Sequence, residues 1–225
     1  MLTAIIVSGC SRNPYISEEI ASITRQHERV AILPVHVSIT GNLPENVTEE
    51  QLNELYETES KMFQNALLSG ILRRTKGGKT PYWVQFLSND ETNTLLEKKQ
   101  INLHEINEYS PTELAEILNV DAVVKADVIK ERFMSETLSA VIAVGEDVIE
   151  EITDVWLPIP SKAKRTYEVY MQLELVDKSS GANLYHRSIR YSIDYRSSVT
   201  DAVYIISGRI GKYFPYKAHK LRKGR

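Results

Sequence analysis

The chain has 225 residues, of which 42% are hydrophobic and 25% charged, with ten Gly, eight Pro and a single Cys. This composition excludes a collagenous chain, a disordered chain and a disulfide scaffold, and the length allows one large core without metals or disulfides. The 27 basic residues against 30 acidic ones give a formal charge of −3, which argues against nucleic acid as a partner, because phosphate binding needs a concentrated positive field.

The amino-terminal residues predict a lipid anchor. Residues 7–10 read VSGC, which resembles the lipobox of bacterial lipoproteins. The resemblance implies that residues 1–9 are the remnant of a signal peptide and that the Cys10 thiol carries the lipid, with palmitate among its acyl chains. The apolar stretch 2–7 is short and no Lys or Arg precedes it, so we expect the true start upstream of Met1 or a trimmed sequence. The alternative is a buried first strand of a cytosolic α/β protein, with Cys10 in its core.

The residues that follow Cys10 predict a tether and a compartment. Residues 10–28 are polar, contain Pro14 and lack a Gly-rich phosphate loop, so we expect them to join the membrane to the domain. Ser11 follows the cysteine instead of Asp, which by the sorting rule of such lipoproteins implies the outer membrane. The domain is expected to face the periplasm.

The first half of the domain alternates strands and helices. A strand is predicted over 29–39, with Pro34 indicating an edge position or a bulge. Thr48 and Gln51 form a capping box that opens a long helix, ending near Arg73. A second strand is predicted over 81–88.

The middle of the chain predicts three helices and a strand. Asp90 is expected to cap a short helix, and another is expected from Asn102. Ser110, Pro111 and Glu113 combine a capping residue, a proline at the first helical position and a reciprocal glutamate, which predicts a helix to about residue 118. The strand 120–129 follows.

The last third predicts a helix, a hairpin and a closing helix. Apolar residues at three and four spacing predict an amphipathic helix over 135–152, followed by a proline-rich linker. Alternating residues over 165–176 and 184–195 predict a β-hairpin. The closing helix begins after residues 197–198 and stops at Pro215.

Several of these segments resemble a family of bacterial envelope lipoproteins. The strand RVAILPV from Arg29, the helix-to-strand pattern over 112–124, the hairpin turn over 175–185 and the helix ending in Phe214-Pro215 appear there in this order. The family includes the curli-secretion channel lipoprotein, lipoprotein activators of penicillin-binding proteins and the TolB-type amino-terminal domain. The resemblance covers about residues 29–216 and implies an anticodon-binding-like α/β sandwich.

The predicted fold is therefore an α/β domain with a mixed sheet and packed helices in two or three layers, in the order β-α-β-α-α-β-α-β-β-α. It would span residues 29–216, with a helical insertion near 135–163 that either packs on the sheet or docks a partner. Residues 217–225 form a basic tail with five of the 27 basic residues, which leaves −8 for the remainder. Such a tail can touch anionic lipid, or it can be an ordinary solvated chain end.

No motif for catalysis or cofactor binding is complete in the sequence. Gly78-Lys79-Thr80 resembles the end of a phosphate loop, but Arg73 stands where that loop needs Gly. His104-Glu105 is followed by Glu108 where a zinc-protease helix needs His. The five His, at 27, 36, 104, 186 and 219, lack ligand spacing, so a structural or solvent-exposed role is expected for each. No catalytic residue, metal or cofactor is predicted.

The sequence thus predicts a non-enzymatic protein anchored to the outer membrane through Cys10. It would act as an interaction, scaffold or assembly component that binds other envelope proteins, with a homo-oligomer as a further option. A ring-forming subunit of a curli-type secretion channel is the alternative, and an envelope hydrolase is the least favoured one. The sequence names neither the partner nor the process.

Overall fold

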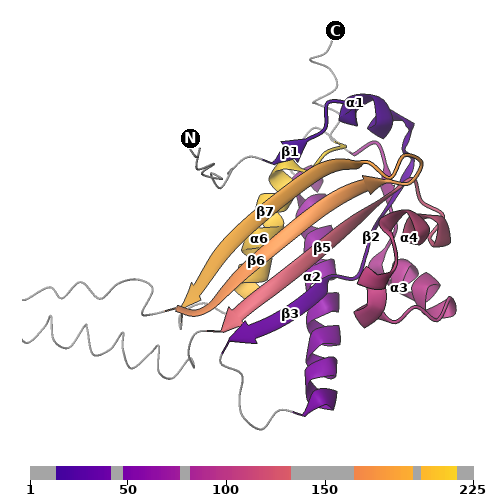
Figure 1. Ribbon diagram of the computed structural model, residues 1–225. Coiled ribbons are helices and arrows are strands. Elements are labelled where there is room, and N and C mark those ends of the chain that lie inside the picture. The colour runs from indigo at the N-terminus through magenta and orange to yellow at the C-terminus, as the bar shows by residue number, and fades with distance from the viewer. Residues whose placement is uncertain (1–13, 42–47, 77–81, 133–164, 195–198, 217–225) are drawn as a thin grey trace, which may run out of the picture.

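The protein is an α/β domain built on one mixed sheet, as a computed structural model shows (Figure 1). The structure describes residues 14–41, 48–76, 82–132, 165–194 and 199–216. The predicted fold class, a mixed sheet with packed helices, is confirmed. The predictions for residues 1–9, Cys10, the insertion near 135–163 and the basic tail 217–225 lie outside the described residues.

Within the described ranges the sheet has seven strands in the order β1-β7-β6-β5-β2-β4, and β3 also pairs with β5. β5, β6 and β7 form an antiparallel meander, whereas β2 and β3 run parallel to β5 and β4 runs parallel to β2. The hairpin of β6 and β7 confirms the predicted one. The strands are β1 (Tyr15–Ile16), β2 (Arg29–Ile32), β3 (His36–Gly41), β4 (Gln85–Phe86), β5 (Ala122–Arg132), β6 (Arg165–Asp177) and β7 (Asn183–Asp194).

The strand predicted over 29–39 is two strands. β2 pairs with the first residues of β5, where Val30 lies opposite Ala122, and β3 pairs with its second half, where His36 lies opposite Asp127. Pro34 lies in the break between the two strands, where its missing N–H removes no ladder hydrogen bond. One long strand is therefore flanked in succession by two short ones.

Helices cover both sides of the sheet, but unequally (Figure 1). On one side, the long α2 (Glu49–Lys76) and α6 (Val199–Tyr213) pack against the main apolar core. On the other side, a smaller core joins the region of β2 and the start of β5 to α3 (Asn89–Lys98), η2 (Leu103–Glu108) and α4 (Pro111–Ile117). The domain accordingly has three layers at the β2 end and two layers over β6 and β7.

The helix starts follow the local capping signals. Thr48 and Gln51 exchange the two hydrogen bonds of a capping box at α2, and Ser110 and Glu113 do the same at α4. The prediction that Asp90 caps the next helix is wrong. Ser88 caps α3, because its side chain accepts a hydrogen bond from the Glu91 N–H and satisfies an amide of the first turn.

Helices α2 and α6 cross in close contact through glycine. A Cβ added to Gly211 would lie 2.1 Å from the Gly70 carbonyl oxygen, and one added to Gly70 would lie 2.6 Å from the Ser207 carbonyl oxygen. Backbones can approach this closely only where side chains are missing. The two glycines therefore set the distance between the helices that cover the main core.

Residues expected to form a tether are built into the domain from Tyr15 onward. β1 pairs antiparallel with β7, and α1 (Ile20–Ile23) and η1 (Thr24–Gln26) lead into β2. The Trp83 indole N–H donates to the Thr24 carbonyl at 3.0 Å and binds this segment to the body of the domain. A two-residue strand is too short to show a period of two, which is why the sequence pattern did not reveal it.

Among the described residues, no helix combines the length and the apolar character needed to cross a membrane.

Candidate functional site

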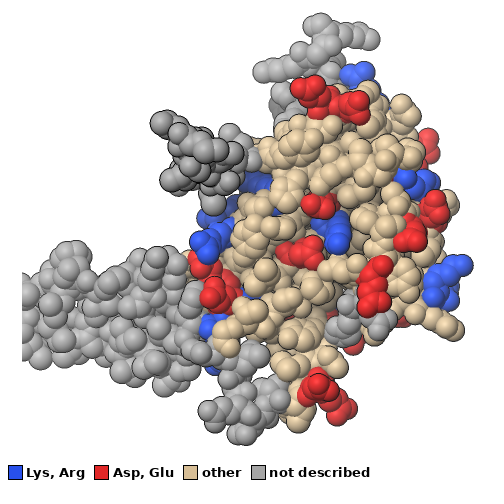
Figure 2. Space-filling model, viewed as in Figure 1, with Lys and Arg blue, Asp and Glu red and all other residues tan. Residues whose placement is uncertain are grey.

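The side of the sheet opposite α2 and α6 presents a broad polar surface over β5, β6 and β7. Alternate residues of these strands point away from the main core and form cross-strand rows, which we call the open face. It is turned toward the viewer in Figure 1, and Figure 2 shows acidic and basic side chains scattered over it. The rows are Lys125, Glu174 and His186; Asp127, Gln172 and Ser188; Ile129, Tyr170 and Arg190; and Glu131, Glu168 and Ser192.

Most carboxylates of the open face have a partner on a neighbouring element. Glu174 Oε1 lies 3.2 Å from His186 Nδ1, and Glu168 Oε1 lies 3.1 Å from Arg190 Nε. Asp127 Oδ1 accepts a hydrogen bond of 2.9 Å from the Asn107 amide. These contacts fix the side chains in place. Glu174 and Asp127 stay within reach of solvent or of a second molecule, whereas Glu168 is buried beneath the exposed Arg190.

The centre of the open face is apolar. Ile129 is 44% exposed, and it lies directly opposite the half-buried Tyr170. The Tyr170 hydroxyl accepts a hydrogen bond of 2.7 Å from the Gln172 amide, which orients the ring. An apolar centre with a polar rim is the usual build of a protein–protein contact. The open face is therefore our candidate functional site.

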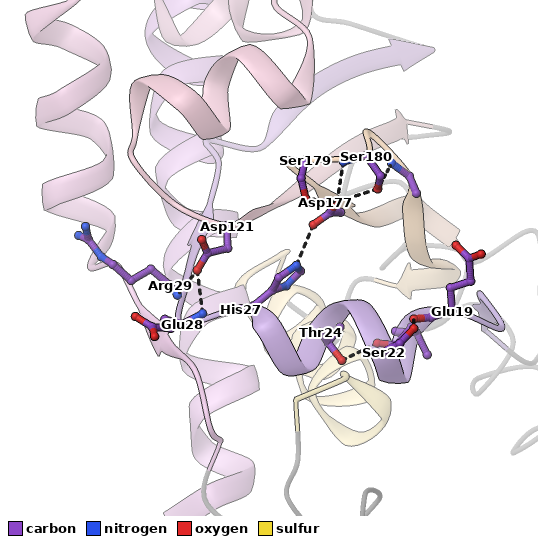
Figure 3. A network of polar contacts seen from close by, with 12 residues as sticks. Glu19, Ser22, Thr24, His27, Glu28, Arg29, Asp121, Asp177, Ser179 and Ser180 are labelled. Atoms are coloured by element: carbon purple, nitrogen blue, oxygen red, sulfur yellow. Dashed lines mark hydrogen bonds and ion pairs between the residues drawn. The ribbon is translucent and has the colours of Figure 1, made fainter.

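A buried polar network lies at the end of the sheet where β2 begins and β6 turns into β7 (Figure 3). His27 Nε2 lies 2.8 Å from Asp177 Oδ1, and His27 Nδ1 lies 2.6 Å from the Tyr216 hydroxyl. Asp177 Oδ2 also accepts hydrogen bonds from the Ser180 N–H and hydroxyl and from the Ser179 hydroxyl. The network joins the segment before β2, the hairpin turn and the end of the chain's described part.

This network has the order of a catalytic triad but is closed to substrate. Tyr216, His27 and Asp177 are only 1%, 5% and 2% exposed. Burial raises the pKa of Asp177, but the hydrogen bonds from Ser180, His27 and Ser179 outweigh it and hold that pKa below its usual value. Burial, with the nearby charge of Asp177, raises the pKa of the Tyr216 hydroxyl well above its usual value. The arrangement favours a charged Asp177 and a neutral Tyr216, and its role is to hold three segments together.

A second carboxylate, Asp121, also joins separate segments of the chain, at the start of β2. Asp121 Oδ2 accepts hydrogen bonds from the backbone N–H groups of Glu28 and Arg29, at 2.7 and 2.9 Å (Figure 3). Burial raises its pKa, but these hydrogen bonds and the neighbouring His27 and Lys178 together lower it below the usual value. Asp121 thus ties the turn before β5 to the strand beside it.

The residues considered from the sequence fall in different places. Cys10, Gly78-Lys79-Thr80 and His219 lie outside the described residues. His36 and His186 are half-buried beside carboxylates on the open face, and His27 is buried in the polar network. Within the described ranges, no group of three or more His, Cys, Asp or Glu side chains could hold a metal ion.

Sequence reasoning missed both the open face and the polar network as units. His27 is 150 residues from Asp177 and 189 from Tyr216, so no local pattern joins them. The open face could be found in part, because alternation within the predicted hairpin separates its two sides. Which side the helices cover is set by tertiary packing.

Comparison with known proteins finds similarity in solved structures only. No protein-family model and no curated protein matches the chain. Lipoprotein GNA1162 from Neisseria meningitidis is similar with a TM-score of 0.40 and 11% identity, over 82% of this chain and 94% of that chain. The PelC dodecamer from Paraburkholderia phytofirmans has a TM-score of 0.35 and 12% identity, over 81% and 84%. The LpoB C-terminal domain from Salmonella enterica has a TM-score of 0.36 and 8% identity, over 78% and 92%.

Among these structural neighbours, GNA1162 is itself a bacterial lipoprotein.

Proposed function

We propose that the protein is a non-enzymatic interaction component of the bacterial cell envelope, with Cys10 as its lipid anchor in the outer membrane. The observation that carries the binding role is the open face, where the exposed Ile129 and the half-buried Tyr170 form an apolar centre inside a rim of paired charges. Binding another protein there would bury the apolar centre and leave the rim wet.

The binding role is tested by a charge placed at the centre of the open face. In Ile129→Arg, a photo-crosslinker elsewhere on that face is expected to lose its crosslinked partners in living cells, because the apolar centre can no longer be desolvated. Ile205→Arg is the matched control, since Ile205 is 38% exposed and lies on α6, on the opposite side of the sheet. Equal loss in both variants, or loss in neither, would contradict a binding role for the open face.

The anchor is tested separately. Mass spectrometry of the mature protein from cells is expected to show a diacylglycerol thioether and a further acyl chain on Cys10. Cys10→Ser is expected to move the protein from the membrane fraction to the soluble one, because anchoring needs two or more acyl chains. An unmodified Cys10 in the native protein would rule the anchor out and leave the binding role untouched.

A further inference from the structure

β3 is an edge strand that leaves half of its backbone groups without a strand partner in the described part of the chain. It pairs with β5 along its whole length, from His36 opposite Asp127 to Gly41 opposite Arg132, and no described strand lies on its other side. In a parallel pair, alternate residues direct their N–H and C=O groups to the neighbour, and the residues between them direct these groups outward. An edge of this kind is a template for one more strand.

Helix α2 turns this edge into a groove. A pocket of about 270 Å³ lies between them, and we call it the edge groove. Its first wall is the continuous segment 35–39, which includes most of β3. Its second wall is one stripe of α2, formed by Asn53, Tyr56, Glu57 and Ser60.

One residue of the α2 wall of the edge groove, Ser60, is polar and buried. Ser60 is only 5% exposed, and its hydroxyl makes no hydrogen bond within the described residues. A buried hydroxyl in this state costs stability until a bound group satisfies it. The Ser60 Oγ has almost no accessible surface, so this cost belongs to the packing of the α2 wall.

The helix wall is acidic. Glu49, Glu50, Glu54 and Glu57 are all exposed in the first turns of α2, and the helix contains no Lys or Arg before Lys61, which pairs with Glu57. β3 itself carries no acidic or basic residue except His36. The charge at the groove thus favours a ligand with cationic side chains.

We propose that the edge groove binds an extended, basic segment of a partner polypeptide as an additional strand beside β3. The segment's backbone would pair with the outward groups of β3, which supplies affinity, and its Lys or Arg side chains would face the glutamates of α2, which supplies specificity. Two copies of this protein pairing through β3 would bring the same glutamates together, which disfavours a second copy as the occupant.

The test uses a labelled peptide of alternating Lys and Val, with a peptide of alternating Glu and Val as its control, and the whole chain in fluorescence anisotropy. Only the basic peptide is expected to bind, and hydrogen exchange is expected to show new protection at residues 36–41. Equal binding of both peptides, or protection elsewhere in the chain without protection of β3, would overturn the proposal.

Backbone pairing is separated from simple charge attraction by N-methylation. One peptide carries methyl groups on the backbone nitrogens of its Lys residues, and a second carries them on those of its Val residues. One of the two is expected to lose binding and the other to keep it, because only every second residue of the peptide faces β3. If both methylated peptides still bind, the contact is charge attraction alone, and strand addition is overturned.

The acidic wall is tested by a pair of matched variants. Glu50→Gln with Glu57→Gln is expected to weaken peptide binding by about tenfold or more, as the loss of close complementary charges does. Glu97→Gln with Glu116→Gln removes the same charge from exposed positions on α3 and α4 and is expected to leave binding unchanged. Equal weakening by both pairs would show that net charge alone attracts the peptide.

Two further outcomes bear on the occupant. A dimer in solution whose β3 amides are protected without peptide would overturn the proposal in favour of pairing between copies. Ile129→Arg is expected to leave peptide binding intact, because Ile129 does not line the edge groove. The edge groove and the open face can therefore fail independently.

Discussion

The two sides of the sheet are made by alternate residues of the same three strands, but in the described part of the chain one is covered by helices and the other is largely not. The covered side meets α2 and α6 and carries fully buried residues such as Val169, Met171 and Leu173. The open face carries paired charges and a partly exposed centre. Geometry on the covered side is fixed by packed apolar side chains and by the close crossing of α2 and α6, whereas on the open face it is fixed by side-chain pairs that another molecule can replace. Stability should therefore depend on the covered side and binding on the open face.

The crossing of α2 and α6 on the covered side should be the most sensitive point of the fold. Gly211→Ala should destabilise the protein by about 2 to 3 kcal/mol, because its Cβ would lie 2.1 Å from the Gly70 carbonyl oxygen and would force α6 away from α2. Chemical denaturation monitored by circular dichroism measures this change in the free energy of unfolding.

Gly208→Ala is the control in the same helix. A Cβ there would meet its nearest neighbour, the Arg73 guanidinium, at an ordinary 3.5 Å. It should stabilise the protein by up to about 1 kcal/mol, because alanine favours the helical backbone over glycine. Equal destabilisation by both substitutions would show that the close crossing does not control stability.

A buried carboxylate should contribute more to stability than one on the open face. Asp177→Asn should lower the free energy of unfolding by about 2 kcal/mol, because a charge-assisted hydrogen bond to His27 and those from Ser179 and Ser180 are weakened inside the protein. Asp127→Asn makes the same chemical change beside His36, where solvent can compensate, and should cost less than about 0.5 kcal/mol. Similar losses in both variants would contradict the distinction between the two sites.

Acid should act through the same buried carboxylate. The pKa of Asp177 is lower in the folded protein than its usual value, so its contribution is fully present above the unfolded pKa of about 3.9 and is lost as the pH falls through the folded pKa. Unfolding free energies measured between about pH 5 and pH 2 should therefore fall with pH, and less steeply in Asp177→Asn. An unchanged slope in that variant would assign the acid sensitivity to other carboxylates, such as Asp121, whose pKa is also lowered.

Local signals in the sequence predicted the parts of the fold that local chemistry determines. The capping boxes at Thr48 and Ser110 identify the starts of α2 and α4, since each is complete within four residues. The hairpin of β6 and β7 followed from alternation on both sides of a short turn. These features need no knowledge of the rest of the chain.

Other parts depend on distant residues and were missed or misplaced. β1 exists because β7 offers Tyr185 and His186 as partners, and two residues carry no periodic pattern. The split at Pro34 depends on β5 being long enough to pair with two strands in turn. The candidate site was missed for the same reason, because helix packing alone decides which side of the hairpin stays open.

A mild substitution on the open face separates stability from binding. Glu174→Gln removes a charge from the open face, where Glu174 and His186 are about one-third exposed and 3.2 Å apart. The free energy of unfolding should change by less than about 0.5 kcal/mol, because solvent screens an exposed pair and water replaces the lost contact. If the open face binds a partner, the same substitution should alter crosslinking yield and its salt dependence, since rim charges act mainly on association. A large loss of stability would instead place Glu174 among the residues that hold the fold, and the functional division between the two sides of the sheet would not stand.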